Sequence, residues 1–209
     1  MRNLSIIWIG LSMFLGSCAN IYFAPQSVSK SKSHNKIAIL SPTISIVERK
    51  TIVKEDANAD DVKNQLSTEI QNDVFSWMQK RNSKKNVHKI EILDVDITNQ
   101  ILKSTDKNIT NDELCKKLGV DAILITKFSI EKKYGDQMAI LLYFLTGGMY
   151  AFNKSCRVNA NLYYCSDNKN GWTYDYSTSG TGFTSYNSMS NALAKHFSKK
   201  TPYTLKSDK

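Results

Sequence analysis

The chain has 209 residues, a formal net charge of +9, four cysteines and three histidines. This length suits one domain with a sizeable core. The positive charge favours anionic lipid headgroups, acidic cell-wall polymers or nucleic acid as partners. The lysines are scattered, however, and their densest run, from Lys80 to Lys89, lies at an expected helix end, which favours a solvated face over a binding patch. No CxxC motif or Cys/His cluster occurs, which argues against a zinc site.

Residues 1–17 have the form of a secretory signal. Arg2 supplies a positive charge, and an apolar run from Leu4 to Leu15 follows it. The run is shorter than the roughly 20 residues that a membrane-spanning helix needs, so we expect the signal to be removed. Loss of Arg2 lowers the formal charge from +9 to +8. Export excludes nucleic acid as a natural partner.

The end of the signal predicts a lipid anchor. Leu15, Gly16 and Ser17 precede Cys18 and resemble the lipobox cut by bacterial lipoprotein signal peptidase. The Cys18 thiol would carry a diacylglyceryl group, and each buried methylene would contribute about 0.8 kcal/mol to attachment. Ala19 follows, without an acidic residue in the next dozen positions, which favours the periplasmic face of the outer membrane. The alternative is an ordinary secretory signal with a chance cysteine.

Composition then suggests the domain limits. Residues 18–35 are rich in Ser, Lys, Gln and Asn, which predicts a lipidated flexible tether that holds the domain on the order of 20 Å from the bilayer. Residues 36–203 form the expected domain, and 204–209 a polar tail.

The first half of the domain predicts alternating strands and helices. The apolar run at 36–40 (KIAIL) predicts a buried strand. Apolar residues then recur at three- and four-residue spacing from 62 to 78, which predicts a long amphipathic helix. Residues 88–95 predict a second strand and 97–102 a short helix.

A short helix and a third strand follow. Thr110 and Glu113 form a capping box, which predicts a brief helix that Gly119 ends. Residues 120–130 then predict the third strand.

The last part of the domain predicts a hairpin and a helix. Polar and apolar residues alternate strictly over 157–164, as in a half-buried strand. Residues 166–171 (SDNKNG) carry turn chemistry, and the alternation resumes through Tyr176. An apolar stripe over 189–197 predicts a last helix, which Pro202 ends.

Three further cysteines, Cys115, Cys156 and Cys165, permit at most one disulfide within the domain. Cys156 and Cys165 lie an odd number of positions apart on one predicted strand, so they point to opposite faces and should not pair with each other.

Four segments resemble a superfamily of bacterial envelope lipoproteins. It includes the curli secretion lipoprotein, the lipoprotein activators of penicillin-binding proteins and the amino-terminal domain of the Tol propeller protein. The segments are KIAIL, EILDVDITNQIL, LCKKLGVDAILITKFSI and NLYYCSDNKNGWTYDYS. With the element order, the resemblance implies a single three-layer-like α/β domain. Its mixed central sheet would have about five strands with flanking helices, as in anticodon-binding-like domains.

Residues 138–152 (MAILLYFLTGGMYAF) form a strongly apolar insertion. In the curli lipoprotein, a hairpin that enters the outer membrane is inserted at about this point. A pore hairpin should alternate apolar and polar residues, whereas 139–145 is apolar at nearly every position. Packing on the core or a sister subunit, membrane contact and, last, a pore all stay open. The expected contact residues are Leu141, Leu142, Phe144, Leu145, Met149, Tyr150 and Phe152.

No catalytic constellation is recognisable. Asp94 and Asp96 end a predicted strand, where turn formation is the simpler interpretation. His34 lies in the expected tether, His88 at a strand start and His196 on an apolar helix face, as a packed core histidine. No phosphate loop, nucleophile elbow or HExxH motif occurs. We expect no enzyme, cofactor or metal.

The predicted function is therefore that of a non-enzymatic, lipid-anchored envelope protein. It would act as an assembly, adaptor or regulatory factor through contacts with an unidentified envelope protein or a second copy. The alternative is a subunit of an oligomeric outer-membrane secretion or transport complex that inserts 138–152 into the membrane. A cell-wall hydrolase or glycan-binding enzyme is a third hypothesis.

Overall fold

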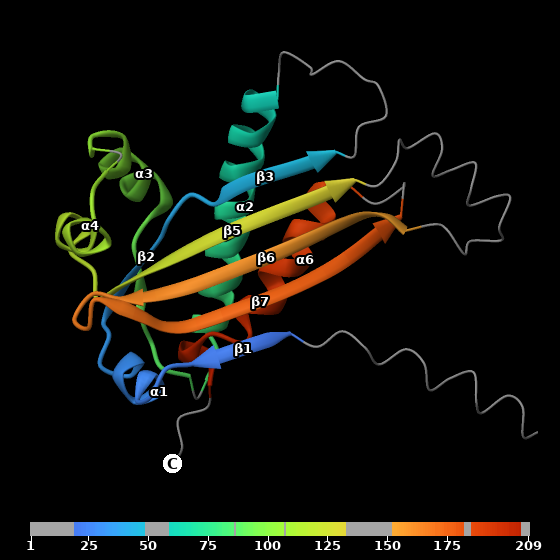
Figure 1. The fold of residues 1–209 in the computed structure, drawn as a ribbon. Coiled ribbons are helices and arrows are strands. Elements are labelled where there is room, and N and C mark those ends of the chain that lie inside the picture. Colours follow the sequence, from blue (N-terminus) through green and yellow to red (C-terminus); the bar gives the residue numbers. More distant parts are fainter. Residues whose placement is uncertain are drawn as a thin grey trace, which may run out of the picture.

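The computed structural model describes residues 19–48, 59–85, 87–106, 108–132, 152–181 and 185–205. They form an α/β domain with a seven-stranded sheet in the order β1-β7-β6-β5-β2-β4, with β3 also paired to β5 (Figure 1). The strands are β1 (Asn20–Phe23), β2 (Lys36–Ile39), β3 (Thr43–Glu48), β4 (Glu91–Ile92), β5 (Ala122–Lys132), β6 (Phe152–Tyr164) and β7 (Lys169–Thr181). The helices are α1 (Ser27–Ser31), α2 (Ala59–Asn82), α3 (Val95–Lys103), α4 (Asn111–Leu118), α6 (Tyr186–Ser198) and the 3-10 helix η1 (Pro202–Thr204).

The sheet is mixed, as the element order predicts. β2 runs parallel to β4 and β5, β3 runs parallel to β5, and the β5-β6-β7-β1 part is antiparallel. Helices α2 and α6 lie behind the sheet in Figure 1, while α3 and α4 lie beside β2 on the other side. Two core clusters result, one under α2 and α6 and a smaller one under α3 and α4. The predicted α/β class with flanking helices is confirmed.

The described part of the chain has two strands beyond the predicted five. β3 alternates apolar and polar residues and pairs with the second half of β5, which extends past the end of β2. β1 pairs with β7. The strand predicted at 88–95 is reduced to Glu91–Ile92, because Asp94 caps α3, which begins at Val95.

The flexible tether predicted for residues 18–35 is not what the structure shows from residue 20 onward. Asn20–Phe23 forms β1 and Ser27–Ser31 forms α1. Ile21 and Phe23 stand opposite Tyr174 and Trp172, so they share the core face of the sheet. The few apolar residues of this segment therefore find partners far away in the sequence, which a reading of local composition cannot detect.

Several local predictions are confirmed. The Thr110 and Glu113 capping box is present, and Gly119 ends α4 with a φ of +61°. In β6, alternate residues from Val158 to Tyr164 are buried, and Asn168 occupies the turn before β7 with a φ of +54°.

The helix stripes need one adjustment. The stripe predicted for α6 consists of Met189, Ala192, Leu193, His196 and Phe197. Of these, Met189, Leu193 and Phe197 are buried, whereas Ala192 is exposed and Ala194 is buried in its place. Among the described helices, none combines the length and the apolar character needed to cross a bilayer.

Candidate functional site

The feature of greatest functional interest is the segment that links the predicted lipid site to the domain, residues 19–35, here called the N-terminal arm. Its first part is fixed to the edge of the sheet, with Asn20 opposite Asp175 and Phe23 opposite Trp172. The pairing ends where the Ala24 amide donates to the carbonyl of Gly171, at 3.0 Å.

The second part of the arm is held by buried aromatic side chains. The Tyr164 hydroxyl donates to the carbonyl of Ser27 at 3.0 Å, and its ring meets His34 edge-on with centroids 4.6 Å apart. His34 Nδ1 is hydrogen-bonded to the Tyr203 hydroxyl at 2.8 Å, and His34 is only 4% exposed. His88 Nε2 donates to the His34 carbonyl at 2.8 Å. The expected tether histidine is thus a core residue, and burial lowers its pKa.

Two carboxylates fix the arm further. Asp121 accepts from the backbone amides of Asn35 at 2.7 Å and Lys36 at 3.0 Å. Asp167, in the hairpin turn, accepts from Lys30 at 2.6 Å, and this contact lowers the pKa of Asp167. The arm is therefore part of the domain along its length.

The fixed arm determines how far the predicted anchor can lie from the sheet. Leu15, Gly16, Ser17 and Cys18 lie outside the described residues. Ala19 packs against the main core cluster, and Asn20 is already paired. At most about 3.6 Å of chain per residue separates Cys18 from Asn20, which is about 7 Å in total.

Most of the predicted apolar contact residues, Leu141, Leu142, Phe144, Leu145, Met149 and Tyr150, also lie outside the described residues. Phe152 opens β6, with its backbone opposite Thr181 of β7. Thr181 lies about 20 Å along β7 from Asp175, at roughly 3.3 Å per residue. Because β1 is antiparallel to β7, the chain enters β1 from this same direction.

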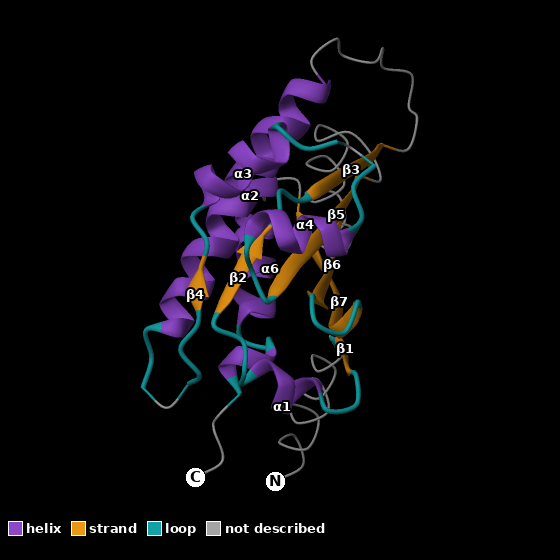
Figure 2. Cartoon of the chain, turned by 90° about the vertical axis from the view of Figure 1, so that its left-hand side faces the viewer, coloured by secondary structure: helices purple, strands orange, loops and turns teal. Residues whose placement is uncertain are grey.

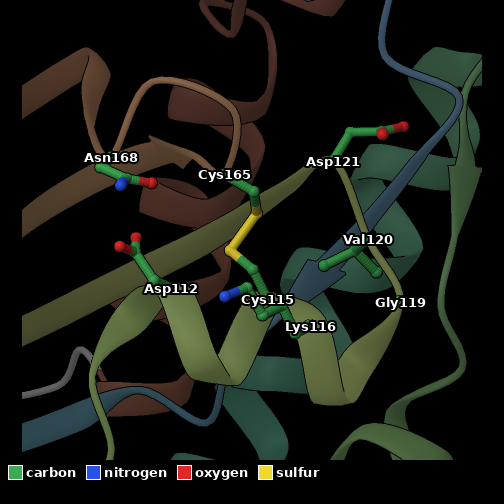
Figure 3. A pocket seen from close by; sticks show the side chains of 8 residues that line it. All are labelled: Asp112, Cys115, Lys116, Gly119, Val120, Asp121, Cys165 and Asn168. Carbon is green, nitrogen blue, oxygen red and sulfur yellow. A yellow bond between two sulfur atoms is a disulfide. The ribbon is translucent and has the colours of Figure 1, made fainter.

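A disulfide marks the opposite end of the sheet. Cys115 of α4 is bonded to Cys165, just after β6 (Figure 3). Cys156 is free and buried in the other core cluster, and burial raises its pKa to about 12. The prediction that Cys156 and Cys165 point to opposite faces and do not pair is confirmed. Burial therefore disfavours the reactive thiolate form of Cys156.

Around the disulfide lies a pocket of about 290 Å³, lined by Asp112, Cys115, Lys116, Gly119, Val120, Asp121, Cys165 and Asn168. Its carboxylates already have structural partners. Asp112 accepts from the Tyr163 hydroxyl, and this hydrogen bond raises the pKa of Tyr163 to about 12. Asp121 holds the arm, so neither carboxylate is placed as a free general base.

The sequence candidates for catalysis do not meet. Asp94 is the N-cap of α3 and accepts from the amides of Asp96 at 2.8 Å and Ile97 at 3.4 Å, so its role is structural, at the start of a helix and not in the expected turn. His196 is hydrogen-bonded to the Tyr174 hydroxyl and stacks on Tyr176, as expected for a packed histidine. Among the described residues, no group of three His, Cys, Asp or Glu side chains could hold a metal ion.

The arm and the disulfide pairing were not found from the sequence. The signal for the arm was the short apolar run at 21–24. The pairing of Cys115 with Cys165 had no local signal, because it depends on where α4 packs against the end of β6.

No protein-family model matches this chain, and no curated protein matches it. Among solved structures, it is similar to a PelC dodecamer from Paraburkholderia phytofirmans, with 10% identity over 91% of this chain and 99% of that chain and a TM-score of 0.48. Lipoprotein GNA1162 from Neisseria meningitidis has 12% identity over 79% and 94% of the two chains and a TM-score of 0.46. The LpoB C-terminal domain from Salmonella enterica has 9% identity over 75% and 95%, with a TM-score of 0.33. Such low scores carry no inference about the task of this chain.

Proposed function

We propose that this protein is an envelope lipoprotein whose domain lies directly on the membrane that holds the lipid of Cys18. The observation that supports it most is that β1 begins two residues after Cys18 and is paired into the sheet from Asn20. A lipid at this position would leave no flexible spacer. The bilayer and the β1 edge of the domain would then be in contact.

The disulfide supports the export on which this proposal depends. Disulfides persist in oxidising compartments such as the bacterial periplasm and are rare in the cytosol. The bond between Cys115 and Cys165 joins two parts of the domain that are 50 residues apart in sequence. Such a crosslink is expected of a domain that folds after translocation.

We propose a non-enzymatic adaptor or regulatory role for the domain, through contacts with another envelope protein. With the β1 edge on the membrane, α3 and α4 lie on the far side of the sheet in Figure 1. This far side is where a partner would bind. Asp112 and Asp121 of the disulfide pocket already accept hydrogen bonds from other parts of the domain, so the pocket suits recognition better than catalysis.

A second candidate, an oligomeric complex that inserts residues 138–152 into the outer membrane, is favoured by the lengths of β5 and β6. These strands extend to Lys132 and Phe152, well past the level at which Asn20 pairs with Asp175. If the strands stood upright on the bilayer, the segment between them would meet the membrane before Cys18 did.

Two experiments test the proposed function. A Cys18→Ser change in the full-length chain should abolish labelling by a fatty-acid probe and leave an unprocessed precursor, while Cys156→Ser should be labelled normally. Continued labelling of Cys18→Ser would refute the anchor.

A photo-crosslinking residue at Lys117 on α4 should capture an envelope protein in cells, whereas one at Thr68, which is exposed on α2 over the opposite face of the sheet, should capture none. If no adduct formed at Lys117 and the purified protein assembled into a ring that required detergent, the adaptor role would be refuted. The oligomeric complex would then be the better explanation.

A further inference from the structure

The C-terminal ends of α2 and α6 lie side by side and bring a concentration of positive charge together. Trp77 Nε1 of α2 donates to the Asn191 side chain of α6 at 3.2 Å. The ammonium groups of Lys80 and Lys195 lie 5.0 and 5.1 Å from the centroid of the Trp77 ring. The two helices thus share one basic surface at these ends.

This basic surface contains no acidic residue in its two sequence segments, 77–90 and 191–205. Its cations are Lys80, Arg81, Lys84, Lys85, Lys89, Lys195, Lys199 and Lys200. Cations at helix C-termini are favoured by the macrodipole alone. Lys199 and Lys200, however, follow the last turn of α6, which ends at Ser198, and both are exposed. The macrodipole of α6 therefore does not account for all of the positive charge.

The basic surface is next to the strand that would follow the lipid. His196 stacks on Tyr176 with centroids 4.6 Å apart and is hydrogen-bonded to Tyr174. Tyr174 stands opposite Ile21 of β1, and Tyr176 lies one residue beyond the Asp175 partner of Asn20. Figure 1 shows α2 crossing behind the sheet from the β3 edge towards the β1 edge, and Figure 2 shows β1 and α1 together at this edge.

The same edge exposes apolar side chains. Tyr22 is 60% exposed and Ile21 36%, although they lie on opposite faces of β1. Aromatic and aliphatic side chains beside a cluster of cations are the combination that binds a bilayer surface, because the rings enter the interface while the cations meet headgroup phosphates.

We infer that the β1 edge, made of Ile21, Tyr22 and the basic surface of α2 and α6, docks on the anionic headgroups of a phospholipid bilayer. This inference rests on the proposed function, because the lipid of Cys18 would hold the edge at the bilayer. Charge complementarity selects the occupant, since the surface is basic and a bilayer rich in phosphatidylglycerol is anionic. The docked edge sets the orientation of the domain, with α3 and α4 turned away from the membrane.

The test uses the mature chain, residues 18–209, with Cys18→Ser, which keeps every described residue and carries no lipid. It should sediment with vesicles that contain phosphatidylglycerol and stay in solution with vesicles of phosphatidylcholine alone. Removing Lys195, Lys199 and Lys200 together, each changed to Ser, should weaken binding by roughly fivefold per cation, about a hundredfold in total.

A matched control removes the same charge from the far side of the domain. Lys103, Lys116 and Lys117 on α3 and α4 are also exposed, and their change to Ser should alter vesicle binding by less than about fivefold. Likewise Tyr22→Ser should weaken binding roughly fivefold, whereas Ile97→Ser, at an exposed position on α3, should leave it unchanged. Circular dichroism and thermal unfolding verify that every variant is folded.

Absence of binding to phosphatidylglycerol vesicles, or equal losses for the two triple variants, would overturn the inference. A stable dimer whose formation is lost with the Lys195, Lys199 and Lys200 changes would also overturn it, since a second copy would then occupy the edge. Because the tested chain has no lipid, a failure of vesicle binding and a failure of Cys18 labelling are separate results.

Discussion

His34 Nδ1 and the Tyr203 hydroxyl form a buried hydrogen bond of 2.8 Å between the N-terminal arm and η1, across 169 residues of sequence. Both side chains are almost fully buried, and Tyr164 packs against the His34 ring. The first and last described segments of the chain are thus joined inside one cluster. Disrupting this cluster should lower the free energy of unfolding of the whole domain.

Removal of the Tyr203 hydroxyl should destabilise the domain. Tyr203→Phe keeps the ring but leaves a polar nitrogen of His34 buried without its partner, which costs about 1–3 kcal/mol. Chemical denaturation of the Cys18→Ser mature chain measures the change in the free energy of unfolding. Tyr22→Phe, which removes an exposed hydroxyl, is the control and should change stability by less than about 0.5 kcal/mol.

The free energy of unfolding should also decrease as the pH is lowered below about 6.5, the ordinary pKa of histidine. Burial lowers the pKa of His34 in the folded state, with a further lowering by His88 and opposing effects of Asp121 and Asp167. The unfolded chain therefore takes up protons first as the pH drops, and unfolding is favoured. From about one pH unit above 6.5 both states hold a mostly neutral imidazole, so this dependence fades.

His196 contributes in the same direction. Burial lowers its pKa, and so do the charges of Lys200 and Lys199. Denaturation curves at pH 7.5, 6.5 and 5.5 should show a loss of stability for the wild type and a smaller loss for a His34→Gln, His196→Gln double variant. A steeper loss in the double variant would contradict this assignment.

The disulfide should be a major stabilising element. Closing a loop with a sequence separation of 50 residues is expected to contribute about 4 kcal/mol through the unfolded state. Cys115→Ser with Cys165→Ser should lower the unfolding free energy by about this amount. Cys156→Ser provides the contrast, because it leaves the bond intact.

Thiol titration checks the same assignment chemically. In the Cys18→Ser chain, the folded state should react with no thiol reagent, because Cys156 is buried and its pKa is raised to about 12. Denaturation without reductant should expose one reactive thiol. Three reactive thiols would mean that the Cys115 and Cys165 bond does not form.

The two described positions at which glycine is constrained should respond differently to alanine. A Cβ at Gly171 would overlap the Tyr164 ring, which is fixed by burial and by its bond to Ser27. Gly171→Ala should therefore cost about 2–3 kcal/mol, in the upper part of the range for overpacking. At Gly119 nothing lies near a Cβ, and only the φ of +61° opposes it, which predicts a cost of about 1 kcal/mol. Equal losses would contradict the close packing at Gly171.

The sequence predicts well those elements whose cause is local. The capping box at Thr110 and the alternation in β6 are each specified by neighbouring residues, and both are present. β1 is different, because its few apolar side chains gain a partner only when β7 is already in place. The strand expected at 88–95 is shortened to Glu91–Ile92 for a local reason, because Asp94 is the N-cap of α3.

The candidate site also has features that neighbouring residues specify and features that depend on the complete fold. The lipobox pattern around Cys18 is local and can be recognised from four residues, although it lies outside the described structure. The absence of a spacer after Cys18 could not be predicted, since composition alone made residues 18–35 resemble a linker. The contacts of Asp121 and His34 with the arm depend on the complete fold.

The pairing of β1 with β7 also has a mechanical consequence. With the β1 edge on the bilayer, a pull on Cys18 in the plane of the membrane would load β1 along its own axis, while its hydrogen bonds to β7 lie across that axis. The bonds would then share the load in shear instead of opening one after another. Behind them, the contacts of His34 and Asp121 would hold the rest of the arm in place. If Cys18 carries a lipid, an arm fixed in this way would transmit force between the membrane and whatever the domain binds.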